Sequence, residues 1–138
     1  MRLTLSSRSW FVLALFCALA PFVNFYVQLY WSMLAMPLTP THFHELAIFW
    51  LFAENFIGAA VAALILAVPL AWLIRGYPLL LASLLAAATT AAVLFMWKGN
   101  FANLAGALTF AELLAFFLFC WLLARLVVRN VRGVGHAA

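Results

Sequence analysis

The sequence predicts an all-α membrane protein, an antiparallel bundle of four transmembrane helices with its N-terminus and C-terminus on the cytoplasmic side. Three observations point to this fold class. Hydrophobic residues make up 70% of the 138-residue chain, charged residues only 7%, and the mean hydropathy is +1.20. A soluble domain carries roughly a quarter charged residues. We therefore expect the apolar core of this chain to form in lipid.

Short polar breaks divide the chain into four apolar stretches, and about 20 apolar residues are enough to cross the hydrocarbon core of a bilayer. We predict spans over 10–36, 45–75, 79–97 and 102–128, within a single domain of residues 1–138. Pro37 and Pro40 follow the first stretch, and a Gly-Tyr-Pro turn follows the second. Pro69 lies inside the second span, where a membrane helix tolerates it as a kink.

The first span begins like a signal peptide, with a short basic start, an apolar run and the small residues Ala18-Leu19-Ala20. Pro21 directly after these small residues argues against cleavage. The apolar run also continues well beyond that point. We therefore expect this segment to remain as an uncleaved transmembrane helix.

The basic residues predict the orientation of the bundle. If both termini are cytoplasmic, six arginines fall on the cytoplasmic side and only Lys98 falls outside, which is the distribution typical of membrane proteins. The six are Arg2, Arg8, Arg75, Arg125, Arg129 and Arg132. The short loops lead us to expect that consecutive helices pack as antiparallel neighbours. The predicted location is the bacterial inner membrane.

Two of the three acidic residues, Glu54 and Glu112, lie inside predicted spans, where a charge costs at least a few kcal/mol. At about 1.5 Å per residue, both lie roughly 13 to 15 Å below the outward ends of their helices. Asn24 and Gln28 reach a similar depth on one face of the first helix, because they are four residues apart. Asn55 flanks Glu54. These five residues predict a polar layer in the outward half of the bundle.

A second group of polar residues is expected at the outward mouth above this layer: His42, His44, Glu45, Lys98 and Asn103. Three of them, His42, His44 and Glu45, are residue types that bind metals. An HxH pattern without a third firm ligand is a loose signal, and a polar helix start explains it equally well. We predict no cofactor, and a bound lipid is left open.

The polar layer has two interpretations. Burial favours the neutral form of a carboxyl group, and a neutral Glu, Asn or Gln often forms hydrogen bonds between membrane helices. The same groups can instead bind a proton, a cation or another ligand between two carboxyls. The first interpretation is the simpler one, and both are kept.

Repeats of small residues at every fourth position predict close contacts between helices. They include Gly58 and Ala62, the row Ala82-Ala86-Thr90, and the row Ala107-Ala111-Ala115. The two cysteines lie inside apolar runs without a CxxC pair, which favours a packing role. Dense aromatic residues in the first and fourth spans leave open a groove for a lipid or a quinone.

The leading functional hypothesis is a non-catalytic subunit or accessory factor that assembles with other membrane chains or with copies of itself. The first alternative is a small oligomeric transporter or channel for protons or cations that uses Glu54 and Glu112. The second is a lipid- or quinone-binding enzyme subunit. Catalytic sequence motifs are absent, so whether the protein is an enzyme stays open, with the balance against it. The basic residues form no stripe typical of nucleic-acid binding, and no nucleic-acid partner is expected.

Overall fold

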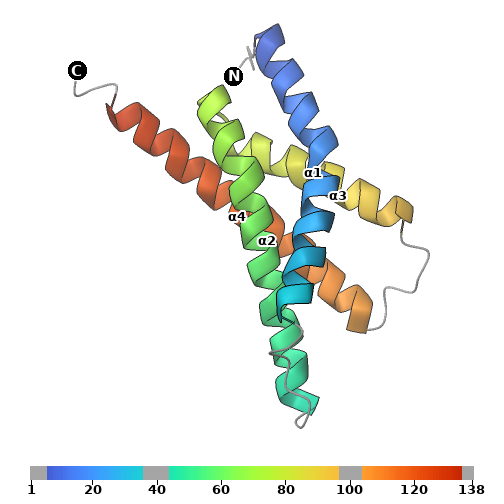
Figure 1. Ribbon diagram of the computed structural model, residues 1–138. Coiled ribbons are helices and arrows are strands. Elements are labelled where there is room, and N and C mark those ends of the chain that lie inside the picture. The colour runs from blue at the N-terminus through green and yellow to red at the C-terminus, as the bar shows by residue number, and fades with distance from the viewer. Residues whose placement is uncertain (1–5, 36–43, 97–103, 135–138) are drawn as a thin grey trace.

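The computed structural model describes residues 6–35, 44–96 and 104–134, and four helices make up almost all of this part of the chain (Figure 1). They are α1 (Ser7–Ala35), α2 (His44–Ile74), α3 (Pro78–Met96) and α4 (Leu104–Val134). Of residues 44, 45 and 132–134, only the backbone is described. Each helix is long and apolar enough to cross a membrane. The prediction of an all-helical protein with four membrane-spanning helices packed together is confirmed, whereas the side on which the termini lie stays a prediction.

The helices differ in length in a way that affects how they cross a bilayer. Helices α1, α2 and α4 have 29, 31 and 31 residues, and α3 has 19. At about 1.5 Å per residue the three long helices exceed a hydrocarbon core of about 30 Å, while α3 matches it. Long spans tilt or extend beyond the core. Pro21 and Pro69 both lie inside continuous helices, as a membrane helix allows when neighbouring groups satisfy the freed carbonyl.

The helices form two antiparallel hairpins, α1 with α2 and α3 with α4, and the second hairpin crosses behind the first in Figure 1. The most extensive packing joins α2 to α4, followed by α1 with α2 and α3 with α4, and then α1 with α3. Helix α2 is thus the central element, because it takes part in the most extensive contact and a larger share of its span is buried than in the other three helices.

Consecutive helices were expected to be close neighbours, but α2 and α3 have the least contact of all the pairs that pack. The residues between them, 75–77, form a tight connection in which Arg75 (φ 55°) and Tyr77 (φ 52°) are both in the left-handed region. The chain turns sharply here, and α3 leaves α2 at a steep angle (Figure 1). Pro78 then begins α3, a position that suits proline because the first helical residue needs no N–H donor.

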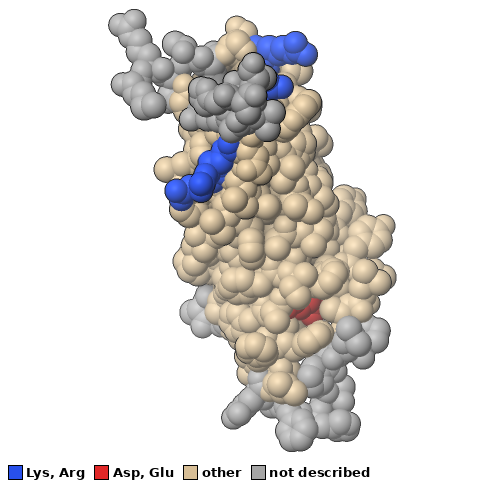
Figure 2. Space-filling model, turned by 90° about the vertical axis from the view of Figure 1, so that its left-hand side faces the viewer, with Lys and Arg blue, Asp and Glu red and all other residues tan. Residues whose placement is uncertain are grey.

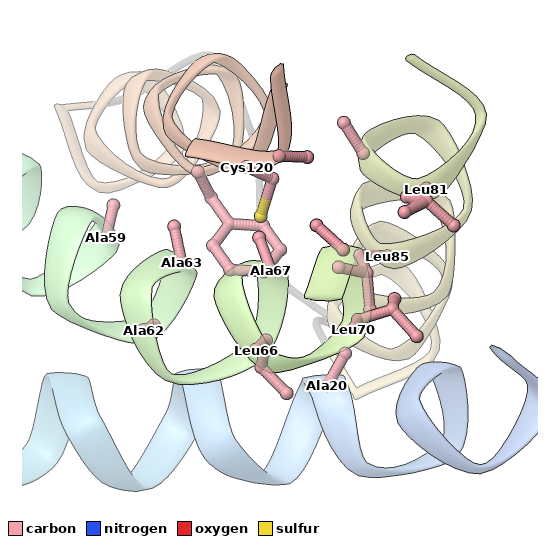
Figure 3. Packing of buried hydrophobic residues seen from close by; sticks show 14 of the residues in the cluster. Ala20, Ala59, Ala62, Ala63, Leu66, Ala67, Leu70, Leu81, Leu85 and Cys120 are labelled. Atoms are coloured by element: carbon pink, nitrogen blue, oxygen red, sulfur yellow. The ribbon is translucent and has the colours of Figure 1, made fainter. Parts of the chain in front are cut away.

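Buried residues follow rows of every fourth position on the packed faces. On α4 the row comprises Phe116, Cys120, Ala124 and Val128, and on α2 two adjacent rows comprise Gly58, Ala62, Leu66 and Leu70, and Ala59, Ala63, Ala67 and Ala71. Figure 3 shows Ala59 and Ala63 turned toward α4 and Leu66 toward α1. When ridges of this spacing interlock, the helices cross at about 50°. This packing accounts for the crossed arrangement of the two hairpins.

The outer surface is apolar between two chemically different ends. In Figure 2 basic side chains gather at one end of the face shown and an acidic side chain lies toward the other. The described basic side chains belong to Arg8, Arg75, Arg125 and Arg129, near the start of α1 and the ends of α2 and α4. These three helix ends lie together at the end of the molecule that carries both termini (Figure 1). Lys98 lies outside the described residues.

Candidate functional site

The centre of the polar layer is a hydrogen bond between α1 and α4. The Nδ2 of Asn24 donates to Oε1 of Glu112 at 2.7 Å. Asn24 is only 4% exposed and lies on the buried face of α1, one helical turn beyond Ala20, which is fully buried. The backbones of α1 and α4 do not pack against each other within the described ranges. The Asn24–Glu112 bond therefore connects two helices that have no backbone packing of their own.

Gln28, one turn further along α1, extends the layer to α2. Its Nε2 donates to the backbone carbonyl of Asn55 at 3.3 Å, and it also makes a side-chain interaction with Glu112. The Gln28 amide occupies space that Gly58 leaves free. A Cβ at position 58 would overlap Oε1 of Gln28 and lie 2.7 Å from its Cδ. Gly58 is therefore required for Gln28 to take this position.

Asn55 contributes its backbone to this contact and uses its side chain locally. Its Nδ2 donates to the carbonyl of Leu51 at 2.7 Å, one turn earlier in α2. The structure thus brings together Asn24, Gln28 and Glu112 with the backbone of Asn55. Their chemical role stays a prediction.

Glu54 lies in a different environment from Glu112. It is 8% exposed and lines a cavity of about 220 Å³ between α1 and α2, together with Trp31 and Trp50. The indole Nε1 atoms of both tryptophans are buried and have no hydrogen-bond partner among the described residues. Glu54 takes no part in the hydrogen bonds that join Asn24, Gln28 and Glu112 in the described part of the chain. The two carboxyls therefore have separate surroundings.

The structure describes no side chain of the predicted outward mouth. His42, Lys98 and Asn103 lie outside the described residues, and for His44 and Glu45 only the backbone is given, in the first turn of α2. Within residues 6–35, 44–96 and 104–134, no group of three His, Cys, Asp or Glu side chains could hold a metal ion. The metal candidates His42, His44 and Glu45 stay a prediction.

The structure also reveals an exposed row of small residues that the sequence analysis missed. Ser83, Ala87 and Ala91 lie at every fourth position on the exposed face of α3. The predicted row on this helix, Ala82-Ala86-Thr90, lies one residue earlier and turns inward, with Ala82 fully buried. Because α3 is rich in alanine on all sides, sequence spacing gave no basis for choosing between the two rows.

An apolar groove of about 390 Å³ runs between α2 and α4, lined in part by Phe56 and Phe119. The lipid- or quinone-binding alternative had its ligand contact the aromatic residues of the first and fourth helices. Helix α1 contributes no residue to this one. Its exposed aromatic residues, which include Phe22 and Tyr30, instead lie on the outer surface.

A scan against protein-family models found no match, and neither did searches of the curated proteins and of the solved structures. Four apolar helices fit a small integral membrane protein. A narrower function has to be inferred from the residues and their geometry.

Proposed function

We propose that this protein is a non-catalytic subunit or accessory factor of a larger membrane complex and that it binds partner chains through the exposed face of α3. The observation that carries the proposal is the exposed row Ser83, Ala87 and Ala91. Lipid tails offer no hydrophobic driving force for helix association, so membrane helices associate where small residues let their backbones approach closely. A row of this kind on an outer face is suited to contact with another helix.

Small residues at the same spacing also form a contact between helices inside the protein. Helix α2 packs against α4 through Ala59, Ala63 and Ala67, again at every fourth position, and these residues are at most 1% exposed. The exposed row on α3 has the same spacing and comparable side-chain size. It therefore has the surface features of a helix interface without a partner among the described helices.

The polar layer supports a structural role for the intramembrane polar groups. Asn24 and Glu112 hydrogen-bond to each other across two helices, which is how polar side chains stabilise helix association in lipid. Under this proposal the layer keeps α1 in place while α3 recruits the partner.

The proposal includes an orientation and a location. The arginine-rich end, which carries both termini, faces the cytoplasm because basic residues are retained on that side of the membrane. The corresponding membrane is the bacterial inner membrane. A reporter fused to the C-terminus that is active only in the cytoplasm tests this arrangement, and activity of an exported reporter at the same position would contradict it.

The test of the interface replaces one small residue by a bulky apolar one. Ala87→Ile should prevent close approach of a partner helix without disturbing the bundle, because Ala87 is exposed. The matched control is Ala14→Ile, at an exposed position on α1. The tagged proteins are purified from native membranes in a mild detergent, and co-purifying membrane chains or further copies are identified by native gel and mass spectrometry.

Wild-type protein and Ala14→Ile should retain the same partner, while Ala87→Ile loses it at unchanged helical content. A wild-type protein that runs as a stable monomer without a co-purifying chain would refute the proposal. Retention of the partner by Ala87→Ile would show that the α3 row is not the interface.

A second function, proton or cation transport, is favoured by the surroundings of Glu54. This carboxyl is buried and lines a cavity, whereas the carboxyl of Glu112 is already bound by Asn24. In proteoliposomes, Glu54→Gln should abolish proton or monovalent cation flux and Glu112→Gln should reduce it less. Wild-type flux no higher than that of empty vesicles, or unchanged flux in Glu54→Gln, would exclude this function.

A further inference from the structure

A second cavity lies at the arginine-rich end, far along the bundle from the polar layer. It has a volume of about 310 Å³ and is formed where the start of α1 meets the end of α2. Its polar lining comes from Arg8 and Ser9 on one side and from Arg75 on the other, next to Trp72. The remaining lining residues, Val12, Leu73 and Ile74, are apolar. The cavity thus combines two arginines with apolar side chains in its lining.

The positive charge of this cavity is not balanced by a described acidic group. No acidic residue lines it. The acidic side chains that the structure describes, Glu54 and Glu112, belong to the polar layer, and Figure 2 shows the acidic side chain on that face well away from the basic end. An anion that entered the cavity would therefore be close to two arginines and, among the described residues, to no acidic side chain.

The start of α1 adds to this charge. Ser6 precedes the helix, and its Oγ accepts a hydrogen bond from the backbone N–H of Ser9 at 3.2 Å, so the helix has a regular N-terminal cap. The N-terminus of a helix carries a partial positive charge and favours anions. Arg8 and Ser9 lie in this first turn and also line the cavity.

Arg75, which lines the cavity, has an unusual backbone conformation. Its φ of 55° lies in the left-handed region, which usually selects glycine or asparagine at the residue that ends a helix. Here that position holds an arginine, whose guanidinium carbon lies 5.7 Å from the ring centre of Trp72.

We infer that this cavity binds the phosphate group of an anionic membrane phospholipid. The planar guanidinium group matches phosphate oxygens in geometry and charge. Trp72 is 56% exposed near the end of a span, where tryptophan lies at the level of the lipid headgroups. Basic pockets between membrane helices at this level suit anionic headgroups, and the apolar lining suits the adjoining glycerol and acyl chains. The inference does not depend on the partner proposed for α3.

The test measures lipid binding to the purified full-length protein in a neutral detergent. Phosphatidylglycerol should raise the unfolding temperature and be retained as a bound lipid in native mass spectrometry. Phosphatidylcholine should do neither, because its phosphate is joined to a choline cation that the two arginines repel. Arg8→Gln and Arg75→Asn should each weaken phosphatidylglycerol binding about five-fold, the effect expected from one basic residue near anionic lipid. Asparagine is chosen at position 75 because it tolerates the left-handed conformation, so this variant keeps the fold.

The chain offers a closely matched control in Arg125→Gln. Arg125 is also exposed and lies over a tryptophan, with its guanidinium carbon 5.6 Å from the ring centre of Trp121, but it does not line the cavity. Its replacement should leave phosphatidylglycerol binding unchanged. Equal losses in all three variants would show general attraction by basic residues and overturn the site. Unchanged binding in Arg8→Gln and Arg75→Asn would also overturn it.

Free phosphate presents the same chemical group as the lipid, so it forms a separate arm of the experiment. Inorganic phosphate at a matched phosphate concentration should not raise the unfolding temperature, because it lacks the glycerol and acyl chains that contact the apolar lining. An equal rise with inorganic phosphate, lost in Arg8→Gln and Arg75→Asn, would assign the cavity to free phosphate and overturn the assignment to a lipid.

Discussion

The contact between α2 and α4 and the contact between α1 and α4 hold the same helix by different means. On the packed face of α4, Phe116, Cys120 and Ala124 are all fully buried, and Figure 3 shows Cys120 directed toward the alanine rows of α2. Against α1, helix α4 makes no backbone packing within the described ranges and is bound instead by the Asn24–Glu112 hydrogen bond. Small and apolar side chains are sufficient to hold α2 and α4 together, because these two helices fit closely. Between α1 and α4, which do not fit closely, a polar pair spans the distance.

This difference reflects how helices associate in lipid. Burying apolar groups gives little driving force when the surroundings are also apolar, so stability depends on dispersion contacts and hydrogen bonds. The packed contact should therefore be sensitive to side-chain volume, and the polar contact to the loss of either hydrogen-bonding partner.

The largest effect is expected from Phe116→Ala, in the packed contact. Phe116 is fully buried, and its truncation should lower the free energy of unfolding by about 2 kcal/mol, mainly through the cavity left behind. The measurement is reversible unfolding in mixed micelles. Phe110→Ala is the control, because Phe110 lies on the same helix and is 69% exposed. A loss no greater than that of the control would contradict the importance of packing here.

A smaller effect is expected at the polar contact. A double-mutant cycle with Asn24→Ala and Glu112→Ala should give a coupling free energy of about 1 kcal/mol, the usual size for a hydrogen bond between membrane helices. The same unfolding assay measures the two single variants and the double variant. Coupling close to zero would mean that the Asn24–Glu112 bond does not hold α1 and α4 together.

The smallest effect is expected from Gly58→Ala, because two contributions oppose each other. The new Cβ displaces the Gln28 amide and weakens its bond to the Asn55 carbonyl, while alanine favours the helix by up to about 1 kcal/mol over glycine. The net loss should be about 0.5 kcal/mol or less. In a Gln28→Ala background the same change should become stabilising. If it is equally destabilising there, Gln28 is not the reason for glycine at this position.

The sequence predicts a shared depth for the polar residues but does not say which of them pair. Asn24 and Gln28 lie four residues apart, so a helix must present them on one face, and the structure has both interacting with Glu112. Glu54 lies at the same predicted depth, yet it lines a separate cavity with Trp31 and Trp50. Depth follows from counting residues along a helix, whereas the direction of a side chain depends on how that helix is rotated against its neighbours.

By itself, the sequence determined that the chain forms four apolar helices able to span a membrane, because the thickness of the bilayer fixes the length and hydropathy that each span needs. The tertiary structure decided which helices are neighbours: α2 packs most against α4 and least against α3, the helix that follows it. It also decided that Ser83, Ala87 and Ala91 face outward while Ala82 is buried. The physical reason is that a helix apolar on all sides has no polar face to indicate its rotation, so only side-chain packing sets it.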